Sequence, residues 1–276
     1  MSPQYTVHAT PEARDAGAVD LAVASLPASF GPAEAGSAAD GSAAAGSAAD
    51  VAVLPGQPGW TAEAARAIDG GARGIVVVNP APESVSDLLE AAETNGSAVV
   101  LDQRWASNPA VPGAEDAVRA MAGRAAVLDS VATAPAGTGS GELLADHLAA
   151  VVRLTGHLEN LRVVASGAHG YTVSGRLANG APAALQGVLS SARPAGVSIS
   201  MLTDDGGVSV TLPDPLAAWP ATVKATGPQG ELLLPTLYES AHRATWRRLK
   251  EHLDAGTSPS DLHRFAALTA SLSALS

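Results

Sequence analysis

The sequence predicts two domains, a parallel α/β layer followed by an α+β domain whose sheet is open and mostly antiparallel. From residue 50 to residue 122, short apolar runs alternate with helical patterns. From residue 126 to residue 212, period-2 runs follow one another, with Asn-Gly and Asp-Gly pairs between some of them. Strands that alternate with helices pair in parallel, whereas runs joined by such turns form hairpins. We therefore expect domains at residues 1–122 and 123–276, with the boundary near Gly123.

In the first domain, Gly74–Val78 reads GIVVV, a β-branched run typical of a strand buried on both faces of a parallel sheet. Thr61 is placed to cap one helix, and Ser84 with Asp87 has the spacing of a capping box for the next. Residues 31–50 form an Ala/Gly/Ser/Asp tract without periodicity, which predicts a loop or linker. The expected strands are Asp50–Leu54, Gly74–Val78 and Ala98–Asp102, and the expected helices are Thr61–Asp69, Ser84–Glu93 and Ala114–Met121.

The second domain combines alternating strands with one long internal helix. Two helices close the chain, the last with Ser258 and Asp261 as its cap and first-turn acid. The expected strands are Ala126–Ala132, Arg162–Ser166, Tyr171–Leu177, Ala184–Leu189, Gly196–Leu202 and Val208–Leu212, and the expected helices are Glu142–Leu154, Tyr238–Leu253 and Pro259–Leu275.

Composition limits the classes of function. The 276 residues are 46% hydrophobic, enough to bury a core, and their formal charge of -11 disfavours binding to nucleic acid or to anionic membranes. The absence of cysteine excludes disulfides, thiolate nucleophiles and Cys-ligated metals. No apolar run approaches the ~20 residues of a membrane span, and residues 1–10 do not resemble an export signal, so we expect a soluble cytoplasmic protein.

Two polar groups could form a site. Asp146 and His147 lie on the long helix one turn after Glu142, an arrangement suited to proton transfer, although a lone histidine on a helix is more often a solvated or hydrogen-bonded residue. Arg104 and Trp105 follow a parallel strand, at the edge where α/β sheets bind ligands. They could stack on a flat ligand ring or fill a domain interface. No HxxxH or HxH pair supports a metal.

Two further features favour structural roles. The glycine turn at residues 137–141 lacks the spacing of a dinucleotide fingerprint, because Glu142 stands where the third glycine is required, and it is interpreted as an ordinary turn. Residues 242–252 form one basic stripe, interpreted as a solvated helix face or an intersubunit salt-bridge surface. The histidines at its ends, His242 and His252, are expected to be surface or cap residues.

The order of the segments resembles the Gfo/Idh/MocA family of NAD(P)-dependent sugar oxidoreductases from about Asp50 onward. DVAVLPGQPGW through SNPAV resembles the family's third strand and the elements after it, and GELLADHLAAVVRLTG resembles the helix that carries the Asp and His of the substrate site. RLANGAPAAL and HLDAGTSPSDLHRFAALTASL resemble a sheet strand and the closing helix. The resemblance implies a Rossmann-like parallel sheet domain followed by an open antiparallel one.

The sequence also departs from the family. Residues 1–60 contain no GxGxxG set, and Val78-Asn79-Pro80 stands where the family has Glu-Lys-Pro, so the first domain is expected to be a truncated Rossmann-like domain. Aligning the long helix on Gly156 places Asp146 on the family histidine, whereas aligning on the histidine selects His147. The resemblance implies these site residues: catalytic Asp146 and His147, cofactor-binding Pro55, Asn79 and Pro80, and substrate-binding Arg104 and Trp105.

Two functions follow as hypotheses. The first is an NAD(P)-dependent dehydrogenase of a sugar or polyol with a degenerate cofactor motif, in which Asp146 or His147 takes the substrate hydroxyl proton. The second is a non-catalytic homologue that has lost NAD(P) and acts as an oligomerising, binding or scaffold protein. Either is expected to form a homo-oligomer through the apolar faces of Ala184–Leu189 and Gly196–Leu202.

Overall fold

The computed structural model describes residues 4–32, 49–215 and 219–275. The chain divides into two compact units: unit 1 consists of Met1–Asp102 and His242–Ala266, and unit 2 of Gln103–Ala241 and Ala267–Ser276. This division differs from the boundary expected near Gly123. The sequence shows where strands stop alternating with helices. It does not show that a helix near the end of the chain packs on the first sheet.

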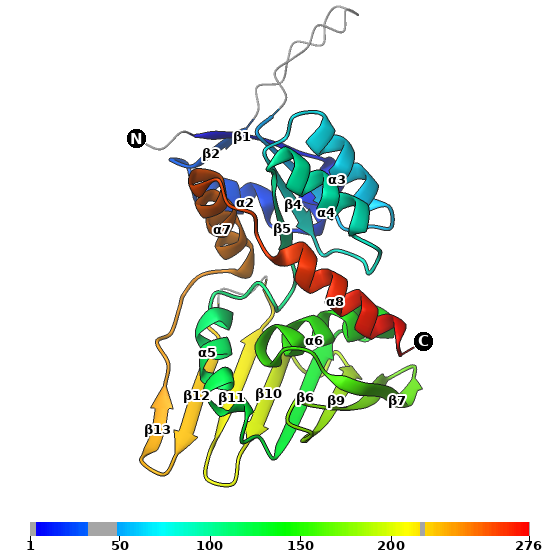
Figure 1. The fold of residues 1–276 in the computed structure, drawn as a ribbon, viewed down its shortest axis with the longest axis vertical. Coiled ribbons are helices and arrows are strands. Elements are labelled where there is room, and N and C mark those ends of the chain that lie inside the picture. Colours follow the sequence, from blue (N-terminus) through cyan, green and yellow to red (C-terminus); the bar gives the residue numbers. More distant parts are fainter. Residues whose placement is uncertain (1–3, 33–48, 216–218, 276) are drawn as a thin grey trace, which may run out of the picture. The chain divides into compact units, whose positions relative to one another are not determined.

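Unit 1 contains a parallel five-stranded sheet in the order β2-β1-β3-β4-β5 (Figure 1). Its last three strands were predicted from the sequence. The first two come from the N-terminal residues, for which no elements had been assigned. The strands are β1 (Tyr5–Ala9), β2 (Phe30–Pro32), β3 (Val51–Pro55), β4 (Gly74–Val78) and β5 (Ala98–Asp102). The helices of this part are α1 (Pro11–Ala16), α2 (Val19–Ala24), α3 (Trp60–Asp69), α4 (Ser86–Asn95), α7 (Ala241–Ala255) and α8 (Asp261–Ser273), the last of which runs on into unit 2.

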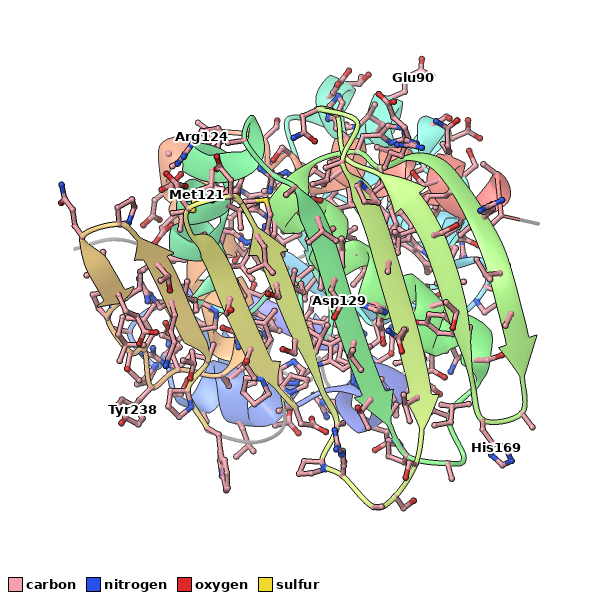
Figure 2. The ribbon with its side chains drawn as sticks, turned by 90° about the horizontal axis from the view of Figure 1, so that it is seen from below. Glu90, Met121, Arg124, Asp129, His169 and Tyr238 are labelled. Carbon is pink, nitrogen blue, oxygen red and sulfur yellow. The ribbon has the colours of Figure 1, made fainter. Side chains whose placement is uncertain are left out.

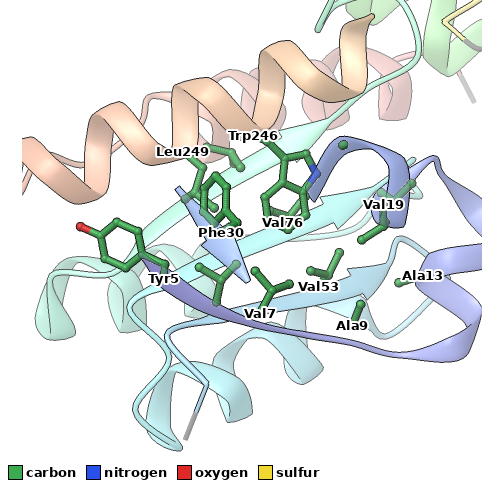
Figure 3. Close-up of a cluster of buried hydrophobic side chains, with 14 of the residues drawn as sticks. Tyr5, Val7, Ala9, Ala13, Val19, Phe30, Val53, Val76, Trp246 and Leu249 are labelled. Atoms are coloured by element: carbon green, nitrogen blue, oxygen red, sulfur yellow. The ribbon is translucent and has the colours of Figure 1, made fainter. Parts of the chain in front are cut away.

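Alternate residues of the sheet build one core of unit 1 beneath α7 (Figure 3). Trp246 of α7 is fully buried and meets Phe30 edge to face, with ring centroids 4.9 Å apart. Val53 and Val76 lie in the same cluster. On the other side of the sheet, Trp60 meets Phe265 in a similar edge contact at 5.6 Å. Two of the few aromatic pairs of the chain thus fix α7 to the sheet and α3 to α8.

Unit 2 contains an eight-stranded sheet in the order β13-β12-β11-β10-β6-β9-β8-β7. Only the β6–β9 pair is parallel within this sheet, so the mostly antiparallel prediction is confirmed. α5 (Val111–Ala122) and α6 (Ser140–Thr155) pack against the sheet and each other. The strands are β6 (Val127–Ala134), β7 (Glu159–Gly167), β8 (Gly170–Arg176), β9 (Pro182–Leu189), β10 (Gly196–Leu202), β11 (Gly207–Pro213), β12 (Thr222–Gly227) and β13 (Gly230–Leu233).

The opposite face of this sheet is polar. Figure 2 looks onto it, with Asp129 near its middle. In the register of the strands, Asp129 pairs with Ser200, Ser200 with Ser209, and Ser209 with Lys224. The apolar residues of Ala184–Leu189 and Gly196–Leu202 that were expected to drive association lie mainly on the other face, where Leu185, Val197 and Ile199 are buried.

The predicted caps differ from the observed ones. α3 begins at Trp60, not Thr61, and α4 begins at Ser86 without a side-chain cap from Ser84. Asp261 is in the first turn of α8, as predicted, and its buried carboxylate also accepts hydrogen bonds from the Leu101 N–H and from Arg248. A capping pattern is local, whereas these partners are distant in sequence.

Of the predicted loop at residues 31–50, positions 33–48 lie outside the described residues. Among the residues that are described, no helix has the length and apolar character needed to cross a membrane.

Candidate functional site

The carboxyl edge of the parallel sheet is the first candidate location. The strand order reverses between β1 and β3, and ligands of open α/β sheets bind at such a switch point. Thr10 follows β1, Pro55 ends β3 and Asn79 follows β4, so these three residues lie at this edge.

Helix α1 lies across this edge. At its start, the Thr10 N–H donates to the carbonyl oxygen of Val53 on β3 at 3.3 Å. At its end, the Asn79 side-chain amide donates to the Ala16 carbonyl oxygen at 3.2 Å. A Cβ on Gly17 would lie 2.7 Å from Val78 of β4. The helix therefore extends from β1 past β3 to β4, over the position where a dinucleotide would cross the sheet.

The helix N-termini at this edge already carry oxygen groups of the chain. In α1, Pro11 has no N–H, the Thr10 hydroxyl accepts the Ala13 N–H at 3.2 Å, and Glu12 adds a negative charge. At the start of α3, the Glu83 carboxylate accepts the N–H groups of Gly59 and Thr61, each at 2.8 Å.

A carboxylate of the chain also lies at the start of α7. The Asp102 carboxylate accepts the Thr245 hydroxyl at 3.3 Å and lies 2.6 Å from Nδ1 of His242. A phosphate binds at a helix N-terminus through free backbone N–H groups and the positive end of the helix dipole. Carboxylates at the starts of α1, α3 and α7 oppose a second negative charge, and at α3 the carboxylate also occupies two N–H groups, so these residues do not fit a pyrophosphate bound in that manner.

The predicted cofactor residues Pro55, Asn79 and Pro80 are brought together by a tight crossing of two strand ends. The Gly56 N–H donates to the Val78 carbonyl oxygen at 2.7 Å. A Cβ on Gly56 would lie 2.3 Å from the Asn79 carbonyl oxygen and from Cα of Pro80. Asn79 has φ of 51°, a left-handed conformation that asparagine tolerates. Since its side-chain amide holds α1, Asn79 has a structural contact where the family carries a lysine.

Removing the Glu83 carboxylate tests the cap of α3. Glu83→Ala should lower the free energy of unfolding by about 1 kcal/mol, because two N–H groups at the helix start lose their acceptor. Urea unfolding followed by circular dichroism measures the change. Glu90→Ala, on the exposed side of α4, is the control and should have almost no effect. Equal effects of the two variants would contradict the capping role.

Unit 2 holds the second candidate location, where Arg104 and Asp146 form an ion pair at 3.7 Å. Both side chains are about one-fifth exposed, at 20% and 21%. Burial raises the pKa of Asp146 to about 6, although Arg104 lowers it; Glu142, one helical turn earlier, raises it further. Asp146 therefore exchanges a proton near neutral pH, as a general base or acid requires.

His147 points into the core of unit 2. It is fully buried, and its two ring nitrogens lie 2.6 Å from the Ser130 hydroxyl and 2.9 Å from the Tyr171 hydroxyl. Burial lowers the pKa of His147 to about 3. Adjacent helical residues point about 100° apart, so Asp146 and His147 have different surroundings. Asp146 is paired with Arg104 and partly exposed, whereas His147 is fully buried; which of the two stands on the family histidine stays a prediction.

Trp105 is also buried, with no exposed surface, and the Arg104 guanidinium lies over its ring at 5.4 Å. Trp105 is therefore placed to support Arg104 rather than to stack on a ligand in solvent. The glycine turn before α6 leads directly into the helix at Ser140, with Glu142 in the first turn, as expected for an ordinary turn.

Sequence reasoning missed several polar partners. His242, expected to be a surface or cap residue, lies in the first turn of α7 and is buried against Asp102, and Ser130 and Tyr171 were not singled out. The basic stripe forms ion pairs within the chain, including Arg248 with Asp261 and Lys250 with Asp254. Lys250–Asp254 is an i, i+4 pair that the helical spacing could have predicted, whereas the other partners are far apart in the sequence and no local pattern identifies them. In the described part of the chain, no three His, Cys, Asp or Glu residues gather in a way that could hold a metal ion.

Neither a protein-family model nor a curated protein matches the sequence. Solved structures do match. A proposed oxidoreductase from Magnetospirillum magnetotacticum MS-1 aligns over 100% of both chains, with a TM-score of 0.70 and 15% identity. UDP-N-acetylglucosamine 3-dehydrogenase GnnA from Acidithiobacillus ferrooxidans aligns over 82% of this chain and 77% of its own, with a TM-score of 0.64 and 16% identity.

A third match is KijD10, a 3-ketoreductase from Actinomadura kijaniata in complex with NADP. It aligns over 82% of this chain and 76% of its own, with a TM-score of 0.62 and 13% identity. The fold is that of Gfo/Idh/MocA-type oxidoreductases. The resemblance inferred from the sequence is thus confirmed for the fold. Compared with the Gfo/Idh/MocA pattern, this chain has Asn79 in place of the lysine, and the Asn79 side chain bonds the end of α1.

Proposed function

We propose that this chain keeps the Gfo/Idh/MocA oxidoreductase fold but acts as a binding protein that does not use a nicotinamide dinucleotide. The position of α1 carries this proposal. Its contacts with Val53 and Val78 occupy the switch point of the sheet, and carboxylates stand at the neighbouring helix starts. A pyrophosphate at this edge would therefore lack several charge-assisted hydrogen bonds, each worth about 1.5–3 kcal/mol.

The ligand proposed for this protein is a sugar or polyol held in unit 2. Arg104 offers N–H donors and Asp146 offers carboxylate acceptors, and hydroxyl groups of a sugar use both. Glu142 adds a second carboxylate on the same helix. The dehydrogenase and ketoreductase among the matching structures support a ligand of this class. Self-association through the sheet of unit 2 is part of the same proposal.

Titration with NADH and NADPH tests the absence of a cofactor. Isothermal calorimetry and nicotinamide fluorescence should both give flat titrations into the millimolar range. GnnA, which has the same fold, serves as the comparison protein for the same measurement. Saturable binding of one dinucleotide per chain would overturn the proposal.

An NAD(P)-dependent dehydrogenase of a sugar or polyol is the second candidate. The observation in its favour is the pKa of Asp146, about 6, which suits a residue that accepts a substrate hydroxyl proton. Turnover with a panel of sugars and polyols tests it. Activity that is abolished by Asp146→Asn would support this candidate, whereas no turnover together with sugar binding would support the first.

A further inference from the structure

Two aromatic side chains differ from all others in the chain. Of the nine Phe, Trp and Tyr residues, seven are buried, with at most 6% of their surface exposed. Trp219 and Tyr238 are 76% and 81% exposed. Both flank the end of the eight-stranded sheet formed by β12 and β13. Aromatic residues are enriched at the centres of protein interfaces, so the surface that carries this pair is a candidate interface with another protein chain.

The two residues lie at the same end of the β12–β13 hairpin. Lys224 pairs with Leu233, and the Leu234 N–H donates to the Val223 carbonyl oxygen at 2.9 Å. Trp219 lies three residues before β12 and Tyr238 five residues after β13, so both belong to the segments that leave the open end of this hairpin. Three leucines extend the exposed apolar surface along the same edge. The β13 edge surface is defined here as Trp219, Leu232, Leu233, Leu237 and Tyr238.

β13 is the end strand of the sheet among the described residues, and its outer side is open for pairing. Successive N–H groups of a strand point in opposite directions. Because the Leu234 N–H points to β12, those of Leu233 and Glu231 point away from the sheet. Such unpaired edges bind other strands unless the protein blocks them.

The two edge strands of the sheet, β7 and β13, differ in how strongly they oppose pairing with another strand. The other edge strand, β7, has two register shifts in its pairing with β8 and carries Glu159 and Arg162, all of which discourage strand addition. β13 pairs regularly with β12 and carries one charged residue, Glu231. The Lys224 ammonium lies 3.1 Å from the Glu231 carboxylate, so that charge is balanced within the chain.

We infer that the β13 edge surface binds a second copy of this chain, with β13 antiparallel to β13 of the copy about a two-fold axis. A two-fold contact presents the same apolar strand from both sides, so it is self-complementary. A register that places Glu231 opposite Leu233 of the copy satisfies the outward N–H groups of both strands. The five side chains expose on the order of 650 Å², close to the ~800 Å² per partner of a standard interface.

At the β13 edge surface, charge neither attracts nor repels a second copy of the chain. The chain carries a net charge of -11, so two copies repel at long range, whereas the β13 edge surface is balanced by its Lys224–Glu231 pair. Added salt screens the long-range repulsion and should strengthen the dimer. A partner held by opposite charge would give the reverse dependence.

Sedimentation velocity of the full chain, from low micromolar to near-millimolar concentration, is the test. The protein should dimerise, more tightly at higher salt. Leu233→Lys, and separately Tyr238→Ser with Trp219→Ser, should each weaken the dimer by about tenfold or more. Val164→Lys, an exposed position on β7, is the matched control and should leave the dimer unchanged.

Amide hydrogen exchange gives an independent measurement. The N–H groups of Leu233 and Glu231 should exchange more slowly as the concentration rises, while those of β7 should not change. A chain that stays monomeric throughout the range overturns the inference. So does a dimer that resists the β13 variants but is broken by Ser198→Arg on the open face of the sheet. Neither result depends on whether a dinucleotide binds.

Discussion

Replacing His147 with alanine should lower the free energy of unfolding by about 3 kcal/mol. The imidazole is fully buried and lies within hydrogen-bond distance of Ser130 and Tyr171. Its removal leaves a cavity and takes one partner from each of two buried hydroxyl groups. Those hydroxyls keep one carbonyl partner each, of Ser198 and of Leu143, which limits the loss. Urea unfolding followed by circular dichroism measures the change. His169→Ala, in the exposed β7–β8 turn, should change stability by less than about 0.5 kcal/mol.

The pH dependence of stability separates His147 from Asp146. Burial lowers the pKa of His147 to about 3 from its ordinary 6.5, so its contribution is complete above pH 6.5 and is lost as the pH falls toward 3. Burial raises the pKa of Asp146 to about 6 from 3.8, so its contribution is complete below pH 3.8 and is lost as the pH rises through 6. Between about pH 4 and pH 6 the two effects oppose each other.

Asp146→Asn should therefore expose the titration of His147. Relative to the unsubstituted protein, this variant should lose stability as the pH falls from 6 to 4, by up to about 1.4 kcal/mol per pH unit. His147→Ala should show the opposite relative slope. The measurement is a series of urea unfolding curves at half-unit pH steps. Parallel pH profiles for all three proteins would contradict the assignment of these pKa values.

Much of the fold could be predicted because its signals are local. The bounds of β4 and β10 match the prediction, since a continuous β-branched run and a period-2 run each identify a strand directly. β2 has three residues and β13 has four, and runs that short carry no period. The short helix α1 was also not predicted, although it lies over the carboxyl edge of the parallel sheet, where a ligand would bind.

The site was less predictable than the fold. The sequence suggested Asp146 and Arg104 separately, but their ion pair depends on how α6 lies against the segment after β5. The choice between Asp146 and His147 is a rotation of about 100° around one helix, which a lone sequence does not fix. Glu83 caps a helix that begins elsewhere in the chain, and Asp102 bonds to side chains of the distant helix α7, so no capping pattern within a few residues reveals either contact.

Trp246→Ala should have the largest effect on stability, a loss of about 3–5 kcal/mol. Trp246 has no exposed surface and packs among Phe30, Val53 and Val76, although it comes from the far end of the chain. The loss should appear in the unfolding of the first sheet, because α7 belongs to unit 1. Leu21→Ala, an exposed position on α2 of the same unit, is the control and should cost less than about 0.5 kcal/mol.

A double-mutant cycle with Phe30→Leu shows whether the loss comes from the aromatic contact. The edge-to-face pair at 4.9 Å should couple the two substitutions by about 0.5–1.5 kcal/mol. Because Trp246 packs on Phe30 of β2 and lies in one cluster with Tyr5 and Val7 of β1, the N–H groups of β1 and β2 should also exchange faster in Trp246→Ala. If the two substitutions are additive and the exchange of β1 is unchanged, α7 does not stabilise the N-terminal strands. The parallel sheet would then have to be held by α1, α2 and its other face.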